Sequence, residues 1–168
     1  MMNRRGLLAA LAGGAVVPGA WPLATDAARA QGAVDPQQYR MMALMGGEFA
    51  IQTSRLALER AADPRVGEFA ELEINEQTAF AASLGARPGV VPLRPDQAQL
   101  IQELSATPPG SRFDRAFVRG QIAGHEELLA LNTAYAQGGA DTVGRAVANV
   151  AVPYIQTHLT TLGRLRRA

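Results

Sequence analysis

Two glutamates and two histidines are the residues of this sequence whose types and spacing could bind a metal ion. Glu73 and Glu76 lie one helical turn apart in the stretch FAELEINEQTAF, between aromatic residues typical of a buried helix face. His125 and His158 are the two histidines of the chain. Two shielded carboxylates this close repel each other unless protons or a cation are supplied. Two carboxylates and two imidazoles would suit one manganese, iron, zinc or copper ion.

In a helical projection, both glutamates fall on the core side of a predicted helix. At about 100° per residue, Glu73, Glu76 and Gln77 share the arc of Phe69 and Phe80. No arginine falls on this inner arc. We therefore expect the two carboxylates to need a positive partner in the interior.

Both histidines also project toward the interior. His125 lies with Gln121 on the apolar arc of one predicted helix, and His158 lies among apolar residues of the next. Glu126 falls on the opposite, polar face, so the run HEE is not a group of ligands. We expect the two glutamates and two histidines to be the metal ligands, supported by Gln77 and Gln121. The alternative is that these polar residues satisfy one another and only fix the packing of the helices.

The elements that position these side chains are predicted to be helices, because the sequence after Asp35 contains no run of alternating β-branched residues. Asp63-Pro64 and Gly138-Gly139 are typical of turns between helices. Four long helices joined in this way predict an all-α, up-down-up-down four-helix bundle. A short extra helix in the crossover between the second and third is expected to cover one end. The predicted helices span residues 36–62, 64–84, 96–105, 111–137 and 140–165.

Residues 1–30 have the pattern of a bacterial export signal. Arg4 and Arg5 precede an apolar run rich in glycine and alanine, and Ala28-Arg29-Ala30 resembles a cleavage site. The paired arginines favour the twin-arginine type, although general secretion signals also carry two arginines. An uncleaved membrane anchor is disfavoured because the run is short and contains glycine and proline. We predict cleavage after Ala30, a single helical-bundle domain at residues 31–168 with no transmembrane span, and a periplasmic location.

Composition excludes several classes of function. All 16 basic residues are arginine, which excludes lysine nucleophiles and Schiff bases, and there is no cysteine. Removal of the predicted signal takes away three of the 16 arginines and one of the 15 acidic residues, which leaves a net charge near −1. Nucleic acid is therefore not an expected partner. The sequence has neither a Gly-x-Ser-x-Gly motif nor a phosphate-binding glycine loop, so a non-enzymatic protein is favoured.

Three stretches resemble the bacterial domain-of-unknown-function 4142 family: LALERAADPRVGEFA at residues 56–70, FDRAFVRGQIAGHEELLAL, and THLTTL. The resemblance spans residues 47–165 and implies an exported, ferritin-like four-helix bundle of unestablished function. The family pattern has an acidic residue followed by histidine in the second helix, and one histidine in each of the third and fourth. His125 and His158 match the last two, whereas Glu76 is followed by Gln77. Gln52 stands where the family favours glutamate, so two amides occupy candidate ligand positions.

Two functional interpretations remain open. In the first, an exported helical bundle binds one transition-metal ion in its core. In the second, a non-enzymatic envelope or stress-related protein binds a partner or a second copy of itself. The first predicted helix supplies the surface for the second interpretation, because its apolar arc is wide enough to be covered twice, with Phe49 and Ile51 on different sides.

Overall fold

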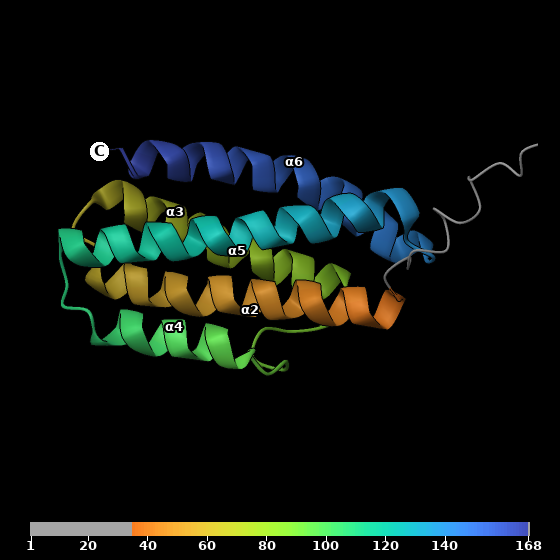
Figure 1. Cartoon of the computed structure of the whole chain (residues 1–168), viewed down its shortest axis with the longest axis horizontal. Helices are drawn as coiled ribbons and strands as arrows, with labels where there is room; N and C mark the ends of the chain where they lie inside the picture. The colour runs from red at the N-terminus through yellow and green to blue at the C-terminus, as the bar shows by residue number, and fades with distance from the viewer. Residues whose placement is uncertain (1–34, 168) are drawn as a thin grey trace, which may run out of the picture. The chain divides into compact units, whose positions relative to one another are not determined.

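The computed structural model describes residues 35–167, which form five α-helices and no strands (Figure 1). The all-α prediction is confirmed, and every helix end lies within two residues of its expected position. The predicted export signal, residues 1–30, lies outside the described residues. The helices are α2 (Pro36–Arg60), α3 (Pro64–Ser83), α4 (Pro95–Ala106), α5 (Ser111–Gly138) and α6 (Thr142–Leu165).

Aspartates begin three of the four long helices. Asp35, Asp63 and Asp141 each accept hydrogen bonds from backbone amides in the first turn of the helix that follows. Pro36 and Pro64 occupy the next position after two of them, where a helix needs no amide hydrogen. Short turns therefore join α2 to α3 and α5 to α6, and the members of each pair run antiparallel (Figure 1).

α5 begins beside the α2–α3 turn, where Asp114 accepts hydrogen bonds from the amides of Ala62 and Asp63. α3 and α5 therefore run parallel, whereas the expected up-down-up-down order requires them to run antiparallel. The long crossover that contains α4 returns the chain to that end of the bundle.

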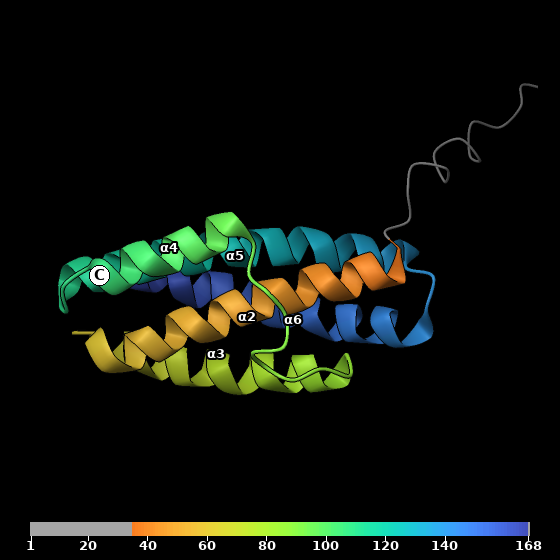
Figure 2. The same ribbon diagram turned by 90° about the horizontal axis from the view of Figure 1, so that it is seen from below.

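The four long helices pack as two hairpins, α2–α3 and α5–α6, that lie side by side (Figure 2). α2 also packs against α5, whereas α3 and α6 touch each other less extensively. The core near the α2–α3 turn is apolar and is built around Phe69, Phe117 and Leu162. Toward the other end, Tyr39 and Tyr135 stack with their ring centroids 3.7 Å apart. The candidate site lies between these two clusters.

The short helix α4 lies lengthwise along α2 and α5, and not across the end of the bundle as expected (Figure 2). Leu104 is 6% exposed and packs into the apolar cluster that contains Phe117. Arg60 donates hydrogen bonds from Nη1 to the carbonyl oxygens of Ser105 and Thr107, which tie the end of α4 to α2. α4 therefore supplies the second cover that the wide apolar arc of α2 requires.

Helical projection of α2 places Glu48 on a polar stripe with Gln52, Arg55 and Glu59, which predicts a solvated side chain. This prediction is wrong for Glu48, which is 4% exposed. Its Oε1 accepts a hydrogen bond from Gln52 Nε2 (2.7 Å), and its Oε2 accepts one from the amide of Gly89 (2.6 Å). Gly89 has a φ of 83°, a conformation that glycine adopts without strain. The crossover between α3 and α4 therefore folds back over α2 and is held there by a buried carboxylate.

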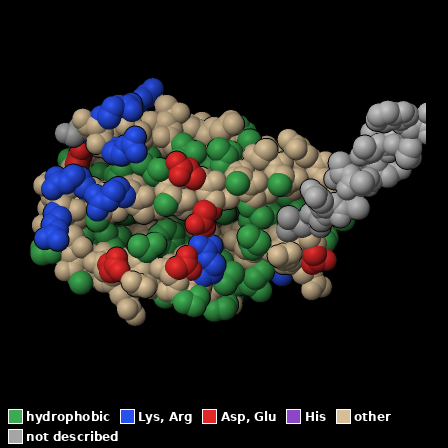
Figure 3. Space-filling view, viewed as in Figure 1, with side chains coloured by type: hydrophobic (Ala, Val, Ile, Leu, Met, Phe, Trp, Pro, Cys, Tyr) green, Lys and Arg blue, Asp and Glu red, His purple; other side chains and the backbone are tan. Residues whose placement is uncertain are grey.

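The bundle face drawn in Figure 3 gathers arginines at the end where α5 begins and α6 ends. This face shows no histidine among the described residues, in agreement with the burial of His125 and His158. Within residues 35–167, no helix has the length and apolar character needed to cross a membrane.

Candidate metal site

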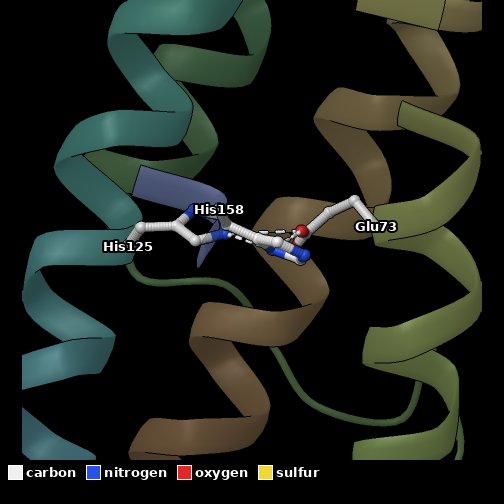
Figure 4. Close-up of side chains that lie close together, drawn as sticks. All are labelled: Glu73, His125 and His158. Atoms are coloured by element: carbon white, nitrogen blue, oxygen red, sulfur yellow. Dashed lines mark hydrogen bonds and ion pairs between the residues drawn. The ribbon is translucent and has the colours of Figure 1, made fainter. Parts of the chain in front are cut away.

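Side chains from three helices converge in the interior of the bundle (Figure 4). Glu73 comes from α3, His125 from α5 and His158 from α6, and they are 0%, 1% and 5% exposed. Glu73 Oε2 lies 2.9 Å from His158 Nδ1 and 3.3 Å from His125 Nε2. The two imidazole nitrogens are 3.1 Å apart. Three of the four ligands expected from the sequence are thus brought together, and we call them the triad.

The second nitrogen of each imidazole in the triad faces a hydrogen-bond acceptor. His125 Nδ1 lies 2.8 Å from the carbonyl oxygen of Gln121, one turn earlier in α5. His158 Nε2 lies 2.9 Å from Glu76 Oε2. When these outer nitrogens carry the ring protons, the inner nitrogens present lone pairs to the centre of the triad. Histidines that bind metals are typically held in this way, with the second N–H donated to a carbonyl or carboxylate.

The two oxygens of Glu73 have different surroundings. Oε1 accepts a hydrogen bond from Nε2 of Gln77 (2.9 Å), one turn further along α3. Oε2 is buried and accepts no hydrogen bond, although it lies within 3.3 Å of both rings. Gly47 on α2 makes room for the Gln77 amide, because a Cβ at that position would lie 2.8 Å from Gln77 Oε1. The carboxylate therefore has one oxygen held in place and one oxygen free to bind a cation.

The separations within the triad match those around a small transition-metal ion. With metal–ligand bonds of about 2.0 to 2.1 Å, neighbouring ligand atoms are about 2.9 Å apart at right angles and about 3.4 Å apart in a tetrahedron. The three separations between the inner atoms of the triad, 2.9, 3.1 and 3.3 Å, lie within this range. Glu73, His125 and His158 form a group that could hold a metal ion.

Glu76, the fourth expected ligand, does not share the centre of the triad. Its Oε2 lies against His158 Nε2, on the side of the ring opposite Glu73. The Glu76 side chain is 19% exposed, whereas that of Glu73 is fully buried. Glu76 is therefore placed to accept the outer proton of His158, and the inner group contains one carboxylate.

The two glutamines expected to support the ligands do so by different groups. Gln77 contacts Glu73 through its side chain. Gln121 contacts His125 through its backbone carbonyl, while its side-chain amide donates to Thr53 Oγ1 (2.8 Å) on α2. Phe69 is a neighbour of the site that the sequence did not predict: its ring centroid lies 5.3 Å from that of His158 and 6.1 Å from that of His125. The sequence feature that could have predicted this contact is the position of Phe69 on the same arc of α3 as Glu73.

Burial and contact with charged neighbours shift the pKa values of Glu73 and His158 in opposite directions. Burial by itself would raise the pKa of Glu73, but the imidazoles of His125 and His158 outweigh it and lower this pKa to about 2. Burial would lower the pKa of His158, but Glu73 and Glu76 outweigh it, so the pKa is raised. Burial raises the pKa of Glu76. The triad thus keeps a carboxylate anion between two rings, an environment that stabilises an added proton or a metal cation.

The fold and the site define a small helical bundle with a buried group of one glutamate and two histidines. The chain matches over residues 22–165 the family described as Domain of unknown function (DUF4142), and it belongs to that family. The resemblance read from the sequence is thereby confirmed. A search of curated proteins gave no match.

Solved structures of other helical proteins share the fold. The structure titled "CopM in the Cu(II)-bound form" has a TM-score of 0.68 at 14% identity and covers 80% of this chain and 97% of its own. A DUF305 fragment from Deinococcus radiodurans has a TM-score of 0.62 at 20% identity, covering 79% and 96%. "CopM in the Ag-bound form (by co-crystallization)" has a TM-score of 0.56 at 17% identity, covering 80% and 96%. At these identities the likeness concerns the fold.

Proposed function

We propose that this protein is an exported, non-enzymatic helical bundle that binds one transition-metal ion through Glu73, His125 and His158. The observation that carries the proposal is the buried Glu73 Oε2, which accepts no hydrogen bond and faces two imidazole nitrogens at ligand spacing. A buried carboxylate needs a positive partner, and a cation bound between Glu73 and the two neutral imidazoles would supply one in place of a proton on the rings. Glu76 assists by accepting the outer proton of His158.

The ligand atoms of the triad indicate the order in which the four expected ions should be tested. One carboxylate oxygen and two imidazole nitrogens suit manganese, iron, zinc and copper, and the absence of cysteine from the sequence removes thiolate ligands. The general order of affinity for such donors places Cu(II) above the others. Two of the structural neighbours are Cu(II)-bound and Ag-bound forms of CopM, which supports testing copper first.

Export rests on the first thirty residues. Arg4, Arg5 and the Ala28-Arg29-Ala30 pattern support a signal that is removed after Ala30 and a periplasmic location for the mature chain. Amino-terminal sequencing of the protein from a periplasmic extract tests this directly. A mature protein that begins at Gln31 is expected, and an intact amino terminus in the cytoplasmic fraction would contradict export.

Thermal melting in the presence of metals tests the binding function. The chain from Gln31, without a histidine tag, is melted alone and with Mn(II), Fe(II), Zn(II) or Cu(II). An ion present at about 100 times its dissociation constant should stabilise the folded state by about 2.7 kcal/mol, a rise of several degrees in Tm. His125→Ala should lose this rise.

Asn132→Ala is the matched control for that experiment. Asn132 is also a buried polar residue of α5 (3% exposed), but its hydrogen bonds are with Tyr39 and with the carbonyl of Leu128. The control should be destabilised like His125→Ala and still respond to metal. If the wild-type protein responds to none of the four ions, the triad is a structural polar network, which is the alternative interpretation.

A further inference from the structure

A surface groove between α3 and α6 leads to the candidate metal site. It has a volume of about 620 Å³, and its apolar walls include Leu72 and Tyr154, each 47% exposed. Glu76 and His158 also line it, so the groove reaches a member of the triad. The relatively sparse contact between α3 and α6 accounts for an opening at this position in the bundle. Glu73 and His125 do not line the groove and are 0% and 1% exposed.

The ring of His158 separates Glu73 and His125 from this groove. It has a carboxylate at each of its two nitrogens. Nδ1 lies 2.9 Å from Glu73 Oε2, and Nε2 lies 2.9 Å from Glu76 Oε2. Glu76 Oε2 is buried, as is Glu73 Oε2. One imidazole therefore belongs to two pairs of metal-binding atoms, an inner pair in the core and an outer pair at the groove.

We propose that the groove between α3 and α6 is the route by which a metal ion reaches the triad, and that Glu76 and His158 Nε2 form an outer position that holds the ion first. This inference rests on the proposed function, because it assigns the access route of the same site. The outer pair offers one oxygen and one nitrogen, so it binds more weakly than the three-ligand triad. A weaker outer position followed by a tighter inner one directs the ion inward.

The transfer is balanced in protons and leaves the oxidation state of the ion unchanged. With the ion on Nε2, the single N–H of the neutral His158 ring is on Nδ1 and faces Glu73. With the ion on Nδ1, this proton is on Nε2 and faces Glu76. The ring changes tautomer as the ion moves from Nε2 to Nδ1: the N–H bond at Nδ1 would break and release its proton to solvent, an N–H bond at Nε2 would form with a proton taken up from solvent, and the number of protons on the ring would be unchanged. A carboxylate lies 2.9 Å from the protonated nitrogen in both states.

Charges along the groove permit the passage of a cation. Arg65 and Arg164 line it together with Glu68 and Glu76. The Arg65 guanidinium is paired with Asp63 at 2.5 Å, which offsets part of its repulsion of a cation. Glu76 is thus an acidic group on the path that is also in contact with a triad histidine.

Rates of copper binding and release test the route. The metal-free mature chain is mixed with Cu(II) in a stopped-flow instrument, and bound Cu(II) is followed by its visible absorbance. Release is followed by adding an excess of EDTA. Glu76→Gln should lower the association and dissociation rates together, each by about tenfold or more, because the amide binds a cation poorly but can still accept the proton of His158.

A second variant blocks the groove without touching the ligands. Leu72→Trp should fill the opening and lower both rates, whereas Leu100→Trp, at a residue of similar exposure (44%) in a different groove beside α4, should leave them unchanged. Rates that are unaltered in Glu76→Gln and Leu72→Trp, with copper bound at equilibrium, overturn the route alone. If Glu76→Gln releases copper faster but binds it at an unchanged rate, Glu76 only positions His158. This result also overturns the proposed route. A wild-type protein that binds no copper at equilibrium overturns both proposals.

Discussion

Gln77 donates a hydrogen bond from Nε2 to Oε1 of Glu73 over 2.9 Å, one turn apart on α3. Both side chains are buried, at 8% and 0% exposure, so the contact is shielded from water. It orients the carboxylate and leaves Oε2 directed at the two imidazoles. The amide of Gln77, at a position where the family resemblance leads us to expect histidine, therefore holds a candidate ligand in place.

Gln77→Leu should remove this hydrogen bond and leave Glu73 Oε1 without a partner. A hydrogen bond to a charged group contributes about 1.5 to 3 kcal/mol, so the free energy of unfolding should fall by that amount. Metal affinity should fall about 10- to 100-fold, as is typical when the support of a ligand is removed. Urea unfolding and metal titration measure the two effects. Thr78→Val, at an exposed residue that bonds only to its own helix, is the control and should change stability by less than about 0.5 kcal/mol.

The triad should give the metal-free protein a characteristic pH dependence. The pKa of Glu73 is lowered from 4.5 to about 2, so its stabilisation is complete above pH 4.5 and is lost as the pH falls toward 2. The pKa of His158 is raised above 6.5, so its stabilisation is complete below pH 6.5 and is lost as the pH rises through the folded-state pKa. Glu73→Gln removes the first effect and the part of the second that Glu73 supplies, whereas the part due to Glu76 is left in the variant. The difference in unfolding free energy between wild type and this variant should be largest between pH 4.5 and 6.5.

Urea unfolding in EDTA, repeated across this pH range, measures that difference. Glu76, whose pKa is raised by burial, also loses stabilisation as the pH rises, but it is present in both proteins. Glu71→Gln, at an exposed glutamate of the same helix, should give a small and nearly constant difference. A Glu73→Gln difference equally flat from pH 3 to 8 would show that the carboxylate and the imidazole do not interact.

The crossover between α3 and α4 should depend on Glu48. Glu48→Ala leaves the amide of Gly89 without its buried acceptor, and the free energy of unfolding should fall by about 1 to 3 kcal/mol. Proteinase K, which cuts after exposed aliphatic residues, should cleave faster at Val90 of the same crossover. Glu59→Ala, at an exposed glutamate of α2, should change stability by less than about 0.5 kcal/mol and leave this cleavage unchanged. Equal cleavage in the two variants would contradict the role of Glu48.

The helices could be predicted because their signals are local. Asp63 followed by Pro64 caps and begins α3 by contacts within a few residues, and Gly138-Gly139 ends α5. The inward direction of Glu73, His125 and His158 follows from the 3.6-residue period of each helix, which needs no knowledge of the neighbouring helices.

What the sequence could not predict depends on how separate elements meet. Glu48 lies on a polar stripe of α2 and is buried only because the distant Gly89 folds over it. Glu76 lies on the inner arc of α3, but the angle at which α6 presents His158 puts this carboxylate on Nε2 and not in the triad. Helical projection predicts which way a side chain points from its own helix. Which side chains come into contact depends on how the neighbouring helices are placed relative to each other.

The central claim is that Glu73, His125 and His158 bind one metal ion, and electron paramagnetic resonance of bound Cu(II) tests it most directly. The mature chain, labelled with ¹⁵N at histidine, is loaded with one equivalent of Cu(II). The spectrum should show one type of copper coupled to two imidazole nitrogens in the wild type and to one in His125→Ala. A wild-type spectrum without nitrogen coupling, or one that His125→Ala leaves unchanged, would contradict the claim.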